Sequence, residues 1–374
     1  MDLGFEGDFW VNAKSIKNPQ WITARAAPNR VKVPPTNFNT VFACDIKPSA
    51  QQVWEAYFRK PVFHLASIVD LVKQAKLGQF TFPHADVVTG GFPCQDFSLA
   101  GKRQGFRTMV GHDMGNLDTP SVESRGMLYY WMREVIALVR PKVFVAENVK
   151  GLVSLGDVKN IIVEDFKNIG AGYIVLNPQV LHAGAYGVPQ TRERVIFIGL
   201  RRDALNDYAL HGLLHGDPTY DPYPAPTHNL KSDIVTVRDA LFDLGEPAAS
   251  SDLSHQVCSH AQWYGKHVQG QIEINPDGLG PTIRAEHHGN IEFRRLSPEH
   301  GGRITSEFSL PERRLTVREC ARIQTFPDDF GFIESGISGT EAYRLIGNAI
   351  PPLLAYHIAQ RLNDLWDKLF YQEP

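Results

Sequence analysis

The chain has few cysteines, no long apolar run and little net charge. Its 4 cysteines, at positions 44, 94, 258 and 320 of 374 residues, are too scattered for a disulfide framework and favour a reducing cytoplasm. No stretch reaches the roughly 18 consecutive apolar residues that a membrane helix needs, and the start MDLGFEGDFW does not read as a secretory signal. A net charge of −3 excludes general attraction to nucleic acid, so such binding would require local basic patches. We therefore expect a cytoplasmic protein without a membrane segment.

Short apolar runs alternate with helical patterns in the first half of the chain. The runs cover residues 40–45, 85–91, 142–149, 173–181 and 194–200, and the helical patterns cover 127–139 and 157–170. This alternation predicts an α/β fold with parallel βαβ units in a doubly wound, Rossmann-like sheet. Ligands of such sheets lie beyond the carboxyl ends of the strands. Cys94 and the Glu147–Asn148 pair fall at such ends.

The alternation stops near Arg201, and we expect three parts of the chain. Residues 1–201 form the first domain, residues 202–312 a smaller, loop-rich domain, and residues 313–374 a segment that returns to the first. In the last segment, Thr316 and Glu319 have the spacing of a capping box, which predicts a helix start. A final helix over 353–370 carries an apolar stripe and should pack on the first domain.

Cys94 stands in GGFPCQDFS, where it could be a buried spacer, a metal ligand or a nucleophile. A lone cysteine is more often structural, although the surrounding proline and polar residues indicate a loop at a strand end. Glu147, taken alone, could be a solvated carboxylate. Arg192 and Arg194 alternate with a glutamate, so a strand would place both on one face, either as an exposed ion-pair ladder or as a functional pair.

Five motifs together are far more specific than any one of them. GFPCQ, ENV, QTRER, RECARIQTFPDDF and GNA follow in this order, and the chain outside 201–312 resembles the DNA cytosine-5 methyltransferases, bacterial restriction–modification type. The resemblance implies the S-adenosylmethionine-dependent methyltransferase fold and methylation of cytosine in double-stranded DNA. It also implies a monomer whose functional partner is a cognate restriction endonuclease. The domain of residues 202–312 would then recognise the target.

The resemblance assigns roles to the catalytic candidates. Cys94 would add its thiolate to carbon 6 of a cytosine that has been flipped out of the duplex. Glu147 would hydrogen-bond N3 and the exocyclic amine of the base. Arg194 would reach the carbonyl O2, and Arg192 would support that side with its positive charge.

Cofactor contacts of the family match further positions of this chain. Asp45 matches the acid that binds the ribose hydroxyls, and Ile46 matches the neighbour that packs on adenine. The remaining positions assigned to the cofactor are Ser67, Ile68, Pro93, Leu128, Asn348 and Ala349.

DNA contacts are implied in two places. The segment after Cys94 matches a loop that closes over DNA, and Ser98, Lys102 and Arg103 are candidates for phosphate binding. In the recognition domain, Thr282 and Arg284 match or follow the family's threonine–aliphatic pair. His255, Cys258, His260 and His267 are ligand types that zinc accepts, but their spacing is irregular and we predict no metal site.

The chain departs from the family at its start. The family's first strand and glycine-rich turn are not found, and MDLGF matches the residues just after that turn, so we expect the sequence to begin at an internal methionine. The 11–39 insertion and the 108–123 loop have no assigned role. Two alternatives stay open: an inactive, truncated fragment that binds DNA, and an RNA cytosine-5 methyltransferase of the same fold.

Overall fold

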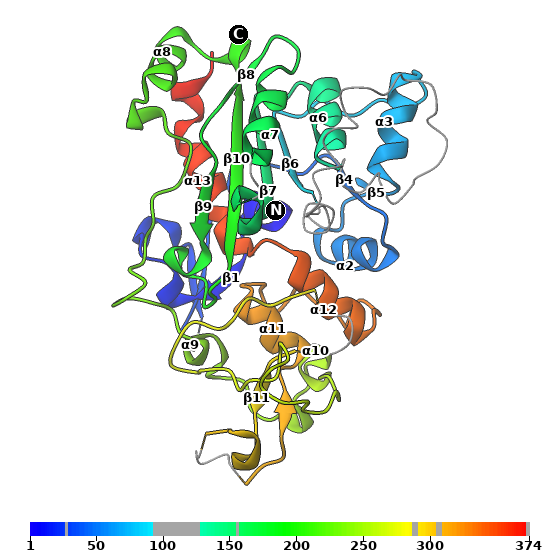
Figure 1. Cartoon of the computed structure of the whole chain (residues 1–374), viewed down its shortest axis with the longest axis vertical. Coiled ribbons are helices and arrows are strands. Elements are labelled where there is room, and N and C mark those ends of the chain that lie inside the picture. The colour runs from blue at the N-terminus through cyan, green and yellow to red at the C-terminus, as the bar shows by residue number, and fades with distance from the viewer. Residues whose placement is uncertain (27–28, 93–127, 155–156, 286–290, 304–308, 372–374) are drawn as a thin grey trace. The chain divides into compact units, whose positions relative to one another are not determined.

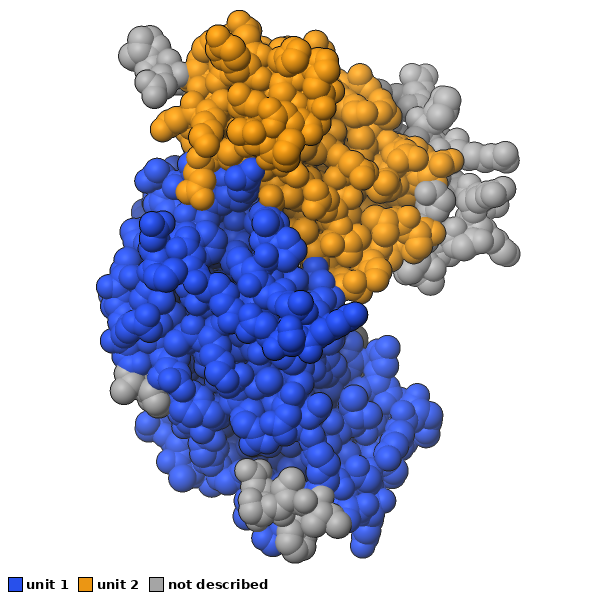
Figure 2. Space-filling model, turned by 90° about the vertical axis from the view of Figure 1, so that its left-hand side faces the viewer, with its two compact units in different colours: residues 1–65, 182–192, 224–363 blue, residues 66–181, 193–223, 364–374 orange. Residues whose placement is uncertain are grey.

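A computed structural model describes residues 1–26, 29–92, 128–154, 157–285, 291–303 and 309–371. These residues form two compact units that interleave along the chain (Figure 2). Unit 1 comprises residues 1–65, 182–192 and 224–363, and unit 2 comprises residues 66–181, 193–223 and 364–374. The predicted boundaries after residues 201 and 312 do not coincide with the boundaries of these units. They rest on the expected roles of the segments and stay a prediction.

Unit 2 is built on a sheet with the strand order β6, β7, β10, β8, in which β9 also pairs with β10 (Figure 1). The strands are β6 Val87–Gly91, β7 Val143–Val149, β8 Tyr173–Val175, β9 Gln179–His182 and β10 Glu193–Arg201. β6 and β7 are parallel as expected, whereas β10 runs antiparallel to both β7 and β8. The expectation of parallel strands is wrong for β10, because no α-helix separates β8, β9 and β10, and parallel neighbours need a long crossover.

Both helices expected beside these strands are present. They are α6 Leu128–Val139 and α7 Val158–Lys167, and unit 2 also contains α3 Ile68–Lys76. The buried side chains of α6 and α7 join one apolar cluster with Phe144 of β7 and Phe197 of β10. Because alternate residues of a strand face the same way, α6 and α7 cover the sheet face that carries these two phenylalanines. This packing fixes β7 and β10, whose ends carry candidate site residues.

Unit 1 holds a second, two-stranded parallel sheet. β4 Ala43–Asp45 pairs with β5 Phe63–Leu65, and α2 Pro48–Phe58 connects them as a βαβ unit. β4 confirms the end of the strand predicted over residues 40–45, and it places Asp45 at the carboxyl end of the strand.

The 11–39 insertion forms structure that its sequence did not indicate. β1 Trp10–Asn12, β3 Arg30–Lys32 and β2 Ala24–Ala26 make an antiparallel sheet in that order, preceded by the short helix α1 Asp2–Glu6. Each strand has only three residues, too few for an alternating pattern to be recognised in the sequence.

Short elements make up the described part of residues 202–312. They are α8 Asp207–His215, α9 Val237–Leu241, α10 Leu253–Gln256 and β11 Phe293–Arg295, the last of which pairs with β12 Arg313–Arg314. Helix α8 was not predicted. It is defined by its ends: the Asn206 side chain accepts from the Ala209 N–H, and Gly216 ends the helix at φ 71°.

The C-terminal helices follow the sequence closely. α11 Val317–Ile323 begins at the capping box, in which Thr316 and Glu319 each bind the other's backbone N–H. It is followed by α12 Gly339–Asn348 and α13 Pro352–Leu369, which confirms the predicted last helix. Among the described residues, no helix combines the length and the apolar character that crossing a membrane requires.

Candidate active site

Glu147 and Arg194 form an ion pair on unit 2, on the sheet face opposite α6 and α7. Arg194 Nε lies 2.6 Å from Glu147 Oε1, and the two side chains are only 12% and 14% exposed. In the β7–β10 ladder, Glu147 pairs with Ile196 and Arg194 pairs with Val149, so the two charged residues are diagonal neighbours on one face. The fold thus brings together two candidates that the sequence offered in separate motifs.

The environment of this pair is polar but largely shielded from water. Burial lowers the pKa of Arg194, whereas the charge and the hydrogen bond of Glu147 act to raise it. Gly91 ends the neighbouring strand β6, and a Cβ atom there would lie 3.0 Å from Glu147 Oε2. Glycine therefore leaves room beside the carboxylate. A guanidinium and a carboxylate held together in this way can donate to a carbonyl and accept from N–H groups of one planar polar ligand.

Asn148 faces the other side of β7 and supports the strand end that leads to Cys94. It is 2% exposed, and its Nδ2 donates to the Phe92 carbonyl at 3.0 Å while its Oδ1 accepts from the Val149 N–H at 2.8 Å. Phe92 is the last residue before the undescribed range 93–127. The sequence placed Asn148 at a strand end and gave it no role. Its position beside Glu147 in ENV was the only signal.

Asp45 and Ile46 lie together at the carboxyl end of β4 in unit 1. Both are exposed, Ile46 by 68%, and Asp45 Oδ1 accepts from the Lys47 N–H at 2.9 Å. The exposed Ile46 side chain can pack on an apolar ring, and the exposed Asp45 carboxylate beside it can accept hydrogen bonds from hydroxyl groups. The residues present therefore fit the adenine and ribose of a nucleoside cofactor.

The other predicted cofactor residues are spread over both units. In unit 2, Ser67 precedes α3, makes no side-chain bond to the first turn, and is followed by Ile68 as the first helical residue. In unit 1, the exposed Asn348 ends α12 and Ala349 follows it. Their cofactor contacts stay predictions. Leu128 starts α6, but its side chain lies outside the described part of the structure.

Arg192 precedes β10 and lies in the interior of unit 1. It is 1% exposed, and its two terminal nitrogens donate to the carbonyl oxygens of Ile283 and Gly347, each at 2.9 Å. Its predicted support of the base stays a prediction, and its hydrogen bonds connect two segments that carry other candidates.

Thr282 and Arg284 flank the fully buried Ile283 in unit 1. The Arg284 guanidinium binds Gln269 Oε1 at 2.6 Å and Glu292 Oε1 at 3.2 Å. Burial raises the pKa of Glu292, against the charge of Arg284. Arg284 is therefore oriented by two partners, and base reading by it stays a prediction.

Several predicted residues lie outside the described ranges. These are Pro93, Cys94, Ser98, Lys102 and Arg103. Of the histidine-rich stretch, His255 is buried, with its ring nitrogens bound to Thr316 Oγ1 at 2.9 Å and to the Gly245 carbonyl at 3.0 Å. In the described part of the chain, no three His, Cys, Asp or Glu side chains are arranged to hold a metal ion.

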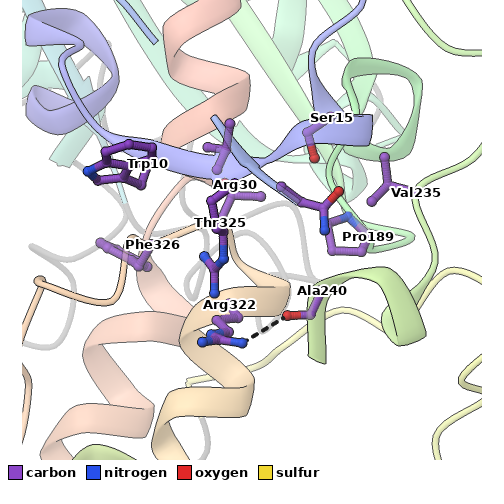
Figure 3. Close-up of a pocket in the computed structure, with 11 residues that line it drawn as sticks. Trp10, Ser15, Arg30, Pro189, Val235, Ala240, Arg322, Thr325 and Phe326 are labelled. Atoms are coloured by element: carbon purple, nitrogen blue, oxygen red, sulfur yellow. Dashed lines mark hydrogen bonds between the residues drawn. The ribbon is translucent and has the colours of Figure 1, made fainter. Parts of the chain in front are cut away.

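A small cavity in unit 1 is lined by the 11–39 insertion and by α11. Its volume of about 20 Å³ has room for one water and none for a nucleoside. Arg30 points toward Arg322 across it (Figure 3). Asp328 holds both arginines, at 3.0 Å from Arg30 and 2.7 Å from Arg322, and Asp243 also binds Arg322. The cavity therefore belongs to an ion-pair network that fastens the insertion.

Comparison with known proteins places this arrangement in context. A model of the family described as C-5 cytosine-specific DNA methylase matches residues 29–364. Type II methyltransferase M.BsuRI of Bacillus subtilis is 32% identical over 86% of this chain and 67% of its own length. Type II methyltransferase M.NgoFVII of Neisseria gonorrhoeae is 32% identical over 81% of this chain and 77% of its own length.

Solved structures show the same fold at low identity. The Dnmt2 methyltransferase of S. pombe aligns with a TM-score of 0.55 and 18% identity, covering 87% of this chain and 92% of that one. Methyltransferase EhMeth of Entamoeba histolytica aligns with a TM-score of 0.55 and 13% identity over 88% and 92% of the two chains. The mixed α/β architecture expected from the sequence is thus the methyltransferase fold.

Proposed function

The chain belongs to the C-5 cytosine-specific DNA methylases, and from this premise we propose that it methylates a specific cytosine in duplex DNA through a covalent Cys94 adduct. The observation that carries the proposal is the shielded Glu147–Arg194 pair. The pair lies beside Gly91, which ends β6 and is the first residue of the GFPCQ motif that contains Cys94. A nucleophile, an acid group and a carbonyl donor are the groups that this chemistry requires.

The residues act on the base in one sequence of bond changes. The Cys94 thiolate adds to carbon 6 while N3 takes a proton, so that carbon 5 becomes electron-rich. Glu147 hydrogen-bonds N3 and the exocyclic amine and assists that proton transfer, and Arg194 donates to O2 as negative charge develops there. After carbon 5 has gained its methyl group, a solvent base removes the carbon-5 proton, and the electron pair of that C–H bond forms the C5–C6 double bond as the S–C6 bond breaks. N3 returns its proton to Glu147, which restores the ring, and the sulfur leaves as the thiolate.

S-adenosylmethionine, when bound, supplies the electrophilic methyl group. Asp45 accepts from the ribose hydroxyls and Ile46 covers the adenine, which accounts for their exposure on unit 1. The other cofactor positions are Ser67, Ile68, Pro93, Leu128, Asn348 and Ala349.

The base must leave the duplex for these groups to reach it, and the DNA is held by other parts of the chain. Ser98, Lys102 and Arg103 bind phosphates, and the segment with Thr282 and Arg284 contacts the target. Similarity to type II methyltransferases supports a role in restriction–modification, in which methylation protects DNA from a cognate endonuclease.

Methyl incorporation into duplex DNA tests the proposal. Purified protein, tritiated S-adenosylmethionine and unmethylated plasmid should give labelled DNA, and bisulfite sequencing should place the label at cytosines of one sequence context. Cys94→Ser should abolish incorporation and keep DNA binding, whereas the matched control Cys258→Ser, in the recognition domain, should retain activity. DNA containing 5-fluorocytosine should trap a covalent complex with the native protein and with Cys258→Ser, but not with Cys94→Ser.

Three results would contradict parts of this scheme. Undiminished methylation by Cys94→Ser would rule out the thiol adduct. Preference for tRNA over duplex DNA in a competition for methyl incorporation would favour the RNA alternative, and DNA binding without transfer by the native chain would favour the inactive one.

A further inference from the structure

We propose that Gln190 and Arg192 are positioning residues that fix the recognition segment, residues 280–285, against the cofactor segment, residues 347–349. Both segments lie in unit 1 together with Gln190 and Arg192. The inference rests on the proposed function, which assigns the first segment to DNA and the second to the cofactor. It gives Arg192 a role that depends on its shape as well as its charge.

The recognition segment is held through the backbone of one residue. The Ile283 N–H donates to Gln190 Oε1 at 3.0 Å, and the Ile283 carbonyl accepts from Arg192 Nη1 at 2.9 Å. Between these two side chains, the Thr191 N–H donates to the Gly280 carbonyl at 2.8 Å. Both polar groups of Ile283 are therefore satisfied by side chains of one short segment, which fixes the register of the residues on either side.

The same two side chains hold the cofactor segment. Arg192 Nη2 donates to the Gly347 carbonyl at 2.9 Å, so one guanidinium connects the two segments directly. Gln190 Nε2 donates to Gln324 Oε1 at 2.6 Å, and Gln324 Nε2 donates to the Ala349 carbonyl at 2.6 Å. Two parallel routes therefore lead from the recognition segment to the cofactor segment.

The two segments also touch each other. A Cβ atom at Gly347 would lie 2.1 Å from the Arg284 carbonyl carbon and 2.2 Å from the Ala285 nitrogen. Real Cβ atoms do not come so close, so only glycine permits this approach of the two backbones. Arg192 binds the carbonyl of this same glycine, and it therefore holds the segments together where they meet.

Burial makes the loss of any hydrogen bond in this network costly. Gln190, Ile283 and Gln324 have no exposed surface, and Arg192 has 1%. A buried polar group that loses its partner is costly, so the network has one satisfied arrangement rather than several. A DNA sequence that displaced the recognition segment would have to break bonds that also hold the cofactor segment. The network thus couples correct target contact to correct cofactor placement.

Two variants remove the connection in different ways, and a third serves as a control. Arg192→Lys keeps the positive charge but has one nitrogen in place of the forked pair. Gln190→Met has nearly the same volume and no hydrogen bonds. Arg318→Lys is the matched control, because Arg318 is 2% exposed and binds Asp252 rather than either segment.

Three measurements on the full chain test the proposal. Bisulfite sequencing of a plasmid library with randomised sites gives the ratio of methylation at cognate and near-cognate sites. Steady-state kinetics give the KM for S-adenosylmethionine, and amide hydrogen exchange follows peptides that cover each segment. We expect Arg192→Lys and Gln190→Met to lower the cognate preference at least 10-fold, to raise that KM, and to speed exchange in both segments. Arg318→Lys should leave the preference and the KM unchanged.

Some outcomes would overturn the inference while leaving the proposed function intact. An unchanged preference and KM in an active variant, or faster exchange in only one segment, would show that the network does not couple the two. A native chain that transfers no methyl group would instead overturn the proposed function. The exchange data would still show whether the two segments are held together.

Discussion

Glu147 and Arg194 hold each other across β7 and β10, with 2.6 Å between Oε1 and Nε. Their neighbours explain the geometry, because Gly91 makes room for the carboxylate and the Glu193 carbonyl accepts from Arg194 Nη1 at 2.8 Å. The fold therefore holds together the two groups that we propose bind the base, and in the proposed mechanism this lowers the cost of arranging them around a flipped cytosine.

Glu147→Gln should lower methyl transfer by about 10²- to 10⁴-fold, the usual range for loss of a general acid–base group. The amide keeps the size of the side chain and loses its ability to carry the proton. Glu193→Gln is the matched control, since Glu193 lies next to Arg194 and its carboxylate forms an ion pair with Lys150 at the surface. Single-turnover transfer to plasmid DNA is the measurement, with thermal unfolding to check folding. Equal activity of the two variants would remove Glu147 from the mechanism.

Asn148→Leu should slow transfer and weaken the fold. The substitution leaves the buried Phe92 carbonyl without the amide donor at 3.0 Å, which should cost about 1–3 kcal/mol of the free energy of unfolding. Because Phe92 leads into the segment with Cys94, we expect kcat to fall. Asn168→Ala, which removes an exposed amide bond to Glu164, is the control. A kcat equal to that of the control would show that Phe92 needs no such support.

Local signals in the sequence predicted those parts of the fold that depend on neighbouring residues. The capping box at Thr316, the apolar stripe of α13 and the buried run of β7 are all determined within one or two turns or a single strand. The orientation of β10 depends on a connection that lacks an α-helix, and this is a property of the whole topology. The sheet formed by the 11–39 insertion likewise depends on pairing between strands of three residues.

The candidate site was predictable in its residue types and not in its contacts. The motifs identified Glu147 and Arg194, but nothing in their spacing indicated that they lie diagonally across an antiparallel ladder. The contacts of Arg192 were equally unpredictable. Its carbonyl partners, Ile283 and Gly347, are 91 and 155 residues away in the chain, and no pattern in a single sequence reports hydrogen bonds to distant backbone groups.

Asp45→Ala should weaken binding of S-adenosylmethionine at least 10-fold, because it removes the acceptor for the ribose hydroxyls. The exposed position of Asp45 makes a large loss of stability unexpected, although the Lys47 N–H loses its acceptor. Calorimetric titration of the cofactor into native and variant protein is the measurement. Glu55→Gln on the adjacent α2 is the control, because Glu55 is exposed and its carboxylate accepts from the Gln51 side chain. Native-like affinity of Asp45→Ala would move the cofactor away from the end of β4.

His357 should make the fold sensitive to mild acid. It is 2% exposed in α13, with Trp21 at 5.0 Å and Tyr186 at 5.3 Å between ring centroids, and burial lowers its pKa to about 3. The ordinary histidine pKa of about 6.5 applies to the unfolded chain, which therefore binds more protons between these two values. Stability from the neutral ring is fully present above pH 6.5 and is lost progressively as the pH falls toward 3.

His357→Phe keeps an aromatic ring and removes the titration. Between pH 7 and pH 5 the native chain should lose about 2 kcal/mol more of its free energy of unfolding than the variant, as the linkage between pKa and stability requires. Urea unfolding at both pH values measures this difference. The substitution also changes packing, so the comparison is between slopes rather than between absolute stabilities. Equal slopes would mean that His357 binds its proton in the folded state nearly as readily as in the unfolded chain, and another group would then have to account for any acid sensitivity.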